Sequence, residues 1–211
     1  AQVTEQELLD ALNKKKRKIL TRGELEGVVA QLKQKGKKIG FTSGSFDLVH
    51  AGHIDYLEKA KEMCDVLIVA VNSDSSIKQY KSEDRPIIPE RWRANLMAGL
   101  QFVDYVFIFD ELSNNTNITL LEPDFYIKAG DWKGKMTSAP IVERYGGKVV
   151  SIPITEEIKT THIINKIKEI MKKEELQGTT MELPASVEKQ KAVFLDRDGT
   201  INNDSGYVSD P

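Results

Sequence analysis

The stretch FTSGSFDLVHAGH, residues 41–53, decides how the rest of the chain is interpreted. A short apolar strand ends in a Gly/Ser turn, and His50 and His53 follow where a helix would begin. Backbone N–H groups at such a turn, next to the positive end of a helix dipole, suit phosphate oxygens. Gly52 keeps the backbone between the imidazoles open to a ligand. The stretch predicts a nucleotide pocket, with two idle surface histidines as the alternative.

The length and composition of the chain limit the classes of protein to which it can belong. A chain of 211 residues with 40% hydrophobic content has room for one domain and an appendage. A net charge of −2 gives no general attraction to nucleic acid, and the basic run 14–18 has no interleaved aromatics, which indicates a solvated linker. The single cysteine, Cys64, excludes an internal disulfide. No apolar run approaches the ~20 residues of a membrane span, and the first residues lack the order of a signal peptide. We expect a cytoplasmic protein with no membrane or nucleic-acid partner.

Apolar runs of strand length alternate with helical patterns from residue 38 onward. Such alternation is typical of βαβ units, so we predict an α/β protein with a Rossmann-like, doubly wound parallel sheet. Thr21 and Glu24 form a capping box that opens a helix ahead of the sheet, and Gly36 ends it. Ligands of such folds bind beyond the carboxyl ends of the strands, where residues 41–53 place the histidines. The predicted strands are 38–43, 66–72, 104–110, 125–129 and 148–152.

Gly44-Ser45-Phe46-Asp47 followed by His50-Ala51-Gly52-His53 resembles the signature of the HxGH nucleotidyltransferases. From about Lys18 to about Lys172 the chain is similar to the D-glycero-β-D-manno-heptose 1-phosphate adenylyltransferases, through residues 18–53, RPIIPERWR (85–93) and KAGDW (128–132). The resemblance implies ATP and a sugar 1-phosphate as substrates, with a homodimer left open. It also implies Mg²⁺ bound mainly through the nucleotide phosphates, because no carboxylate cluster has metal-ligand spacing.

Polar residues follow the second predicted strand. Asn72 and Asp74 are placed to bond ribose hydroxyls or the base, with a plain turn as an equal alternative. Residues 75–88 predict a long polar binding loop. Lys81 and Arg85 in it match basic positions of the resembled family, which favours a phosphate role over a solvated surface.

Three further side chains belong to the similar segments. Arg91 looks like the family's helix-borne arginine. Lys128 ends the fourth strand, where a buried lysine is costly unless it meets an anion, so it is a phosphate candidate, with a solvent-facing chain as the alternative. Trp132 either stacks on a base, lines the sugar pocket or packs on the core. KAGDW departs from the family's lysine-glycine-glycine-aspartate-aromatic pattern at Ala129.

Residues 158–162 resemble the family's second signature, a serine and two threonines at a helix start that hold phosphates. Thr160 and Thr161 match it, whereas Lys159 replaces the serine. Ser43 and Ser45 stand where the heptose enzymes more often have asparagine and cysteine.

The resemblance implies in-line attack by a sugar-phosphate oxygen on the α-phosphorus of the nucleotide, with pyrophosphate expelled and no nucleophilic side chain needed. Two alternatives stay open, namely a cytidylyltransferase for a small phosphorylated alcohol and a nucleotide-binding domain without turnover. The residues assigned to catalysis are His50 and His53 at the α and β phosphates, and Lys81 and Lys128 at acceptor or triphosphate charge. The predicted nucleotide-binding residues are Ser43, Gly44, Ser45, Phe46, Asp47, Gly52, Asn72, Asp74, Arg85, Arg91, Gly130, Asp131, Trp132, Thr160 and Thr161.

The composition becomes polar after Lys172, and an apolar strand then runs into Asp196-Arg197-Asp198. Two carboxylates at a strand end form a plausible nucleophile and general acid/base pair, with an aspartate-rich turn as the alternative. The segment resembles the opening motif of haloacid-dehalogenase-type phosphatases, in particular the heptose bisphosphate phosphatases, which implies a truncated domain of a bifunctional protein. We expect no Mg²⁺-dependent phosphatase activity from these residues.

The sequence thus predicts four segments. An N-terminal helical extension, 1–36, packs on the nucleotidyltransferase domain, 37–172. A linker, 173–190, leads to a truncated C-terminal stub, 191–211, which holds the first strand and motif of the phosphatase domain.

Overall fold

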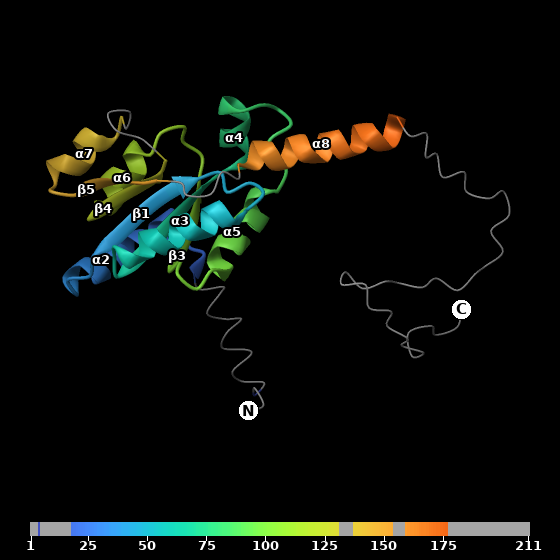
Figure 1. The fold of residues 1–211 in the computed structure, drawn as a ribbon. Helices are drawn as coiled ribbons and strands as arrows, with labels where there is room; N and C mark the ends of the chain where they lie inside the picture. Colours follow the sequence, from blue (N-terminus) through green and yellow to red (C-terminus); the bar gives the residue numbers. More distant parts are fainter. Residues whose placement is uncertain (1–3, 5–17, 131–136, 154–158, 177–211) are drawn as a thin grey trace, which may run out of the picture. The chain divides into compact units, whose positions relative to one another are not determined.

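The computed structural model describes residue 4 and residues 18–130, 137–153 and 159–176. Five parallel strands form one sheet in the order β3-β2-β1-β4-β5 (Figure 1). Every predicted strand is present within one residue at each end, which confirms the Rossmann-like α/β fold. The strands are β1 (Ile39–Gly44), β2 (Val66–Asn72), β3 (Tyr105–Phe109), β4 (Phe125–Ala129) and β5 (Lys148–Ile152).

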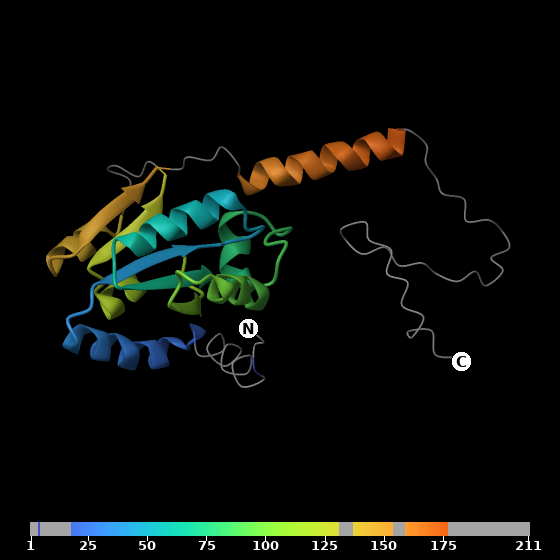
Figure 2. The ribbon, with the colours of Figure 1, turned by 60° about the horizontal axis from the view of Figure 1, so that its bottom comes forward.

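Helices connect successive strands, as parallel pairing requires. They cover both faces of the sheet, and Figure 2 shows the sheet between α3 and α2. The helices are α2 (Arg22–Gln34), α3 (Ala51–Glu62), α4 (Asp74–Tyr80), α5 (Glu90–Gly99), α6 (Asn115–Leu121), α7 (Ala139–Arg144) and α8 (Thr160–Leu176).

The sheet separates two apolar cores. On one face, β2 and β4 pack against α3 and α5, with Leu57 and Met97 fully buried. On the other face, β1 and β3 pack against α2, α6 and α7, with Leu25 and Ile118 fully buried. All seven residues of β2 are buried, as expected of a central parallel strand with helices on both sides. Because apolar side chains on both faces of the sheet are buried under helices, the loops that could bind a ligand lie at the carboxyl edge of the sheet.

The capping box that opens α2 is confirmed. The Thr21 N–H donates to Glu24 Oε2 at 2.7 Å, and the Glu24 N–H donates to Thr21 Oγ1 at 3.3 Å. Gly36 has a φ of +65°, the left-handed conformation that ends helices and suits glycine. The first part of the predicted helical extension, residues 1–17, lies outside the described residues except for Thr4.

The prediction of one long loop over residues 75–88 is wrong for its first part. Asp74–Tyr80 forms α4, which places Lys81 at the C-cap position of this helix. The Ser73 hydroxyl caps the helix by accepting the Ser76 N–H at 3.1 Å. A serine at this position is a standard N-cap signal, and the polar composition of the segment concealed it.

The chain divides into two compact units, residues 1–167 and 168–211. In the second unit the structure describes residues 168–176, the last turns of α8. The helix therefore continues past residue 172, where the sequence predicted its end, because Lys and Glu propagate helices well. The rest of the expected linker and the whole C-terminal segment lie outside the described residues. Among the helices that are described, none has the length and apolar composition of a membrane span.

Candidate active site

The turn between β1 and α3 carries the predicted signature. Phe46 and Leu48 have φ values of +46° and +53°, an uncommon conformation for bulky side chains. Local strain of this kind persists only where neighbouring contacts hold it. The Phe46 ring is buried beneath Gly44, where a Cβ would meet it at 3.2 Å. The residues between Gly44 and the helix are thus held in one defined shape.

His50 is the N-cap residue of α3, and His53 lies in the first turn. Their ring centroids are 4.0 Å apart and the ring planes are tilted by 45°, so the two imidazoles lie next to each other at the start of the helix. The His50 backbone N–H donates to His53 Nδ1 at 3.4 Å, so the neutral His53 ring carries its proton on Nε2. His50 Nδ1 is buried and has no hydrogen-bond partner within the described residues. Gly52 is buried between the two.

Burial governs the protonation of both rings. It lowers the pKa of His50, and together with the charges of His50 and Lys81 it lowers the pKa of His53 to about 4. Near neutral pH, His53 is therefore a neutral donor through Nε2–H. Such a donor can bond a phosphate oxygen and can respond to the charge that develops there.

Asp47 ties the turn to the segment that follows α4. Its carboxylate is 1% exposed; it accepts the N–H groups of Ile87 and Ile88 at 3.0–3.2 Å. Arg85 Nη2 pairs with the same carboxylate at 2.6 Å. The backbone carbonyl of Asp47 also accepts a hydrogen bond from Thr160 Oγ1 at 2.9 Å, which brings the start of α8 to the turn. Asp47 thus acts as an anchor for three segments.

The cation of Lys81 lies at the same turn. Its Nζ donates to Ser45 Oγ at 3.0 Å. Burial, followed by the charge of Arg85, lowers the pKa of Lys81. The structure therefore brings together His53, Ser45 and Lys81 at the end of β1, as the sequence predicted.

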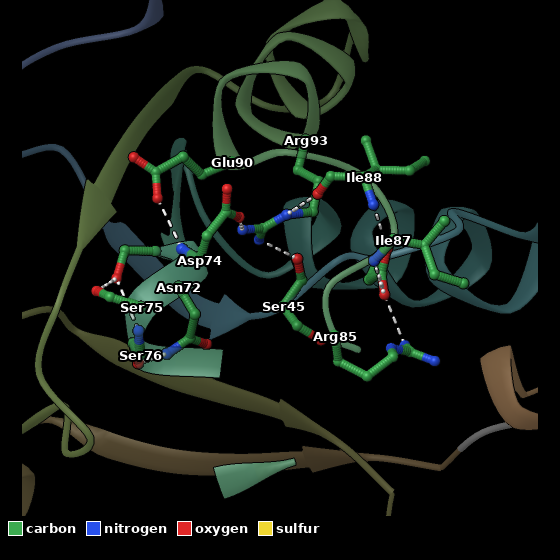
Figure 3. A network of polar contacts seen from close by, with 12 residues as sticks. Ser45, Asn72, Asp74, Ser75, Ser76, Arg85, Ile87, Ile88, Glu90 and Arg93 are labelled. Atoms are coloured by element: carbon green, nitrogen blue, oxygen red, sulfur yellow. Dashed lines mark hydrogen bonds and ion pairs between the residues drawn. The ribbon is translucent and has the colours of Figure 1, made fainter. Parts of the chain in front are cut away.

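Arg93, which sequence reasoning missed, is the most buried charged residue of the site. Its side chain is fully buried and joins Asp74 Oδ1 at 2.6 Å, the Ser45 carbonyl at 2.5 Å and the Ile88 carbonyl at 2.8 Å (Figure 3). Arg91, which the sequence singled out, is exposed on α5. The signal that could have found Arg93 is its spacing on α5, four residues before the buried Met97.

Asn72 and Asp74 follow β2 as predicted, and both are engaged within the protein. Asn72 Nδ2 donates to Ser76 Oγ at 3.2 Å, and Figure 3 shows the two side chains turned toward each other. Asp74 is the counter-ion of Arg93, and its N–H donates to Glu90 at 2.7 Å. Their contacts are those of residues that shape the carboxyl edge of the sheet; a direct role toward a nucleotide stays a prediction.

Lys128 is the penultimate residue of β4, and its side chain is directed at the end of β1. Its Nζ donates to the Ser43 carbonyl at 2.9 Å and to Ser43 Oγ at 2.7 Å. Burial lowers the pKa of Lys128 to about 8. No ion pair with a carboxylate joins Lys128 to any residue in the described part of the chain. A half-buried ammonium with no carboxylate partner among the described residues is a candidate site for an anion.

The remaining predicted residues divide between the described and undescribed parts. Gly130 has a φ of +94°, and its N–H donates to the Ile152 carbonyl at 2.7 Å. Thr160 and Thr161 begin α8 as predicted. Asp131 and Trp132 lie outside the described residues, as do the C-terminal Asp196 and Asp198.

The comparisons with known proteins agree with this geometry. The chain belongs to the cytidylyltransferase-like family, whose model matches residues 41–184. It is 49% identical over 145 residues to the bifunctional protein HldE of Campylobacter jejuni subsp. doylei, and 44% identical over 144 residues to that of Geobacter metallireducens. Each match covers 68% of this chain but only 31% and 29% of those relatives. The domain is accordingly a nucleotidyltransferase.

Among solved structures, the lipopolysaccharide core biosynthesis protein from Thermoplasma volcanium is 27% identical to the chain. That match has a TM-score of 0.49 and covers 58% of this chain and all of the other.

Proposed function

We propose that this domain transfers AMP from ATP to a sugar 1-phosphate, with D-glycero-β-D-manno-heptose 1-phosphate as the acceptor, in the synthesis of a lipopolysaccharide or other surface glycan. The observation that carries the proposal is the pair of adjacent histidine rings at the N-terminus of α3, beside the strained turn that follows β1. The identity of the acceptor is supported by the resemblance of residues 18–53, 85–93 and 128–132 to the heptose enzymes.

In the proposed reaction, an oxygen of the sugar phosphate attacks the α-phosphorus of ATP, a new P–O bond forms, and the bond to the β-phosphate oxygen breaks. Pyrophosphate leaves with the electron pair of that bond. The neutral His53 donates from Nε2 to an oxygen of the α- or β-phosphate, and His50 lies beside it. Charge on the leaving group increases as the bond breaks, so donors held in place by the fold stabilise the transition state more than the ground state.

Two lysines and the start of α8 complete the proposed site. Lys81 approaches the turn from the end of α4, Lys128 from β4, and the two threonines supply hydroxyl and N–H groups from the start of α8. Neutralisation of phosphate charge by preorganised lysines and helix N–H groups needs no covalent intermediate.

Mg²⁺ enters this proposal as part of the nucleotide substrate. The carboxylates nearest the turn are already paired, Asp47 with Arg85 and Asp74 with Arg93. Within the described ranges, no three His, Cys, Asp or Glu side chains gather in a way that could hold a metal ion. These residues fit a cation that is carried by the triphosphate, which is how Mg²⁺ commonly reaches phosphoryl-transfer sites.

The test is pyrophosphate release by the 211-residue chain with ATP or CTP against a panel of sugar 1-phosphates and small phosphorylated alcohols. The proposal predicts turnover with ATP and the heptose 1-phosphate. Turnover only with CTP and an alcohol phosphate would instead assign a cytidylyltransferase, to which the description of the matched family model also points.

A further inference from the structure

Asn114 is placed at the N-cap of α6, yet its side chain does not cap the helix. Asparagine is among the residues most favoured at this position because its oxygen accepts the N–H groups of the first turn. Here Asn114 Nδ2 instead donates to Ser43 Oγ at the end of β1, at 2.7 Å. The contact joins residues 71 positions apart in the sequence. The Asn114 side chain thus bonds the end of β1 and not the backbone N–H groups of the first helical turn.

The hydrogen bond from Asn114 to Ser43 is part of a network of four side chains. Asn117, fully buried in α6, donates from Nδ2 to Asn114 Oδ1 at 3.5 Å. Asn114 donates to Ser43 Oγ, and Lys128 Nζ donates to the same oxygen from the other side, also at 2.7 Å. The two nitrogens are thus close neighbours around one hydroxyl. Because both lone pairs of the Ser43 hydroxyl accept, its orientation is fixed.

This cluster and the histidines lie on opposite faces of the sheet. Ser43 meets α6, which packs on the face that carries Leu25 and Ile118, whereas the histidines belong to α3 on the other face. Displacement at the α-phosphorus is in line, so the attacking oxygen and the leaving pyrophosphate must lie on opposite sides of that atom. If the triphosphate binds at the α3 side, the acceptor approaches from the side of α6.

The charge of the cluster agrees with an acceptor phosphate. Lys128 is half-buried; within the described part of the chain its Nζ donates to two Ser43 oxygens and lies 5.5 Å from the centroid of the Tyr126 ring. Two of its three ammonium hydrogens are used in the bonds to Ser43, and the third is available to a ligand. A phosphate dianion that contacts Lys128 would gain a buried charge-assisted hydrogen bond. The amide of Asn114 fixes the hydroxyl on which this ammonium is aligned.

We propose that Asn114 is a positioning residue for the phosphate of the acceptor, acting through Ser43 and Lys128. This inference rests on the proposed nucleotidyl transfer and assigns the α6 side of the site to the sugar 1-phosphate.

The test compares Asn114→Ala and Asn114→Asp with Thr119→Ala, an exposed position on the same helix. Aspartate is as good an N-cap as asparagine, so Asn114→Asp keeps the helix but places a carboxylate where the amide donated. The KM for the acceptor should rise about 5–10-fold in Asn114→Ala, as for one lost hydrogen bond, and at least about 30-fold in Asn114→Asp through charge repulsion. The KM for ATP and the melting temperature of Asn114→Asp should stay near the values of Thr119→Ala.

The inference is overturned if both Asn114 variants keep the acceptor KM within about twofold of the control, or if the KM for ATP rises equally. If the unsubstituted chain turns over no sugar phosphate, the proposed function fails, and binding of inorganic phosphate measured by calorimetry then decides the inference alone. Phosphate should bind the unsubstituted chain and Thr119→Ala alike, and Asn114→Asp at least about tenfold more weakly. Equal binding by all three, or none by the unsubstituted chain, would refute it.

Discussion

The substitution Lys128→Met measures how much the charged Lys128 side chain lowers the free energy of unfolding. In the unfolded chain the lysine has a pKa near 10.5, and burial lowers the pKa to about 8 in the folded protein. Between these values the unfolded state holds a proton that the folded state does not. The free energy of unfolding therefore rises with pH across this window, since the unfolded state binds more protons.

The magnitude follows from the same two pKa values. At pH 7 the lysine is protonated in both the folded and the unfolded state. The pKa difference of about 2.5 then destabilises the folded state by roughly 3 kcal/mol. At pH 10 the folded lysine is neutral and most of that cost has gone. The unsubstituted chain should therefore gain about 2.5 kcal/mol relative to Lys128→Met between pH 7 and pH 10. Methionine has similar length and no titration, so the difference between the two proteins reports Lys128 alone.

The assay is urea unfolding of both proteins at pH 7, 8, 9 and 10, with Lys33→Met as a matched control on an exposed lysine. Lys33→Met controls for the loss of one positive charge, so the effect of pH is judged on the difference between the Lys128 and Lys33 variants. A difference between these two variants that stays constant with pH would mean that Lys128 keeps an ordinary pKa. Lys128 would then not be the anion site that we propose.

The structure leads to three further predictions. Between pH 7 and pH 5, the free energy of unfolding of the unsubstituted chain should fall by about 2 kcal/mol more than that of His53→Gln, because the pKa of His53 is about 4 in the folded protein and its neutral form is favoured there. Equal losses for the two proteins in urea titrations would contradict this. Asp47→Asn should cost about 3 kcal/mol by leaving Arg85 partly buried without its partner, and a cost below about 1 kcal/mol would remove Asp47 as the anchor. Glu122→Gln, which breaks the exposed pair with Lys33, should change stability by less than about 1 kcal/mol in the same assay.

Features that depend on local sequence could be predicted. The five strands were visible as apolar runs, because a parallel strand buried on both faces needs an uninterrupted apolar segment. The capping box of α2 rests on Thr21 and Glu24, three residues apart. The histidine signature also lies within a single stretch, and its geometry depends on one turn of helix. In each case the residues that determine the structure are neighbours in the chain.

Features that depend on distant contacts could not be predicted. Arg93 was missed because the large apolar residues of α5 lie on more than one side of the helix: Met97 is buried, whereas Trp92 and Leu96 are exposed. Their pattern conceals the face on which the arginine is buried. Asn114 was missed because its contact with Ser43 spans 71 residues and crosses from α6 to β1. A composition of short polar residues before α6 is typical of any helix cap and gives no sign of such a contact.

The decisive experiment measures pyrophosphate formation from ATP and D-glycero-β-D-manno-heptose 1-phosphate by the unsubstituted chain and by His50→Ala and His53→Ala. We expect turnover by the unsubstituted chain and a loss of at least ~100-fold in each variant, about 3 kcal/mol of transition-state stabilisation, with folding preserved. If both variants turn over at the unsubstituted rate, the two histidines do not carry the nucleotidyl transfer.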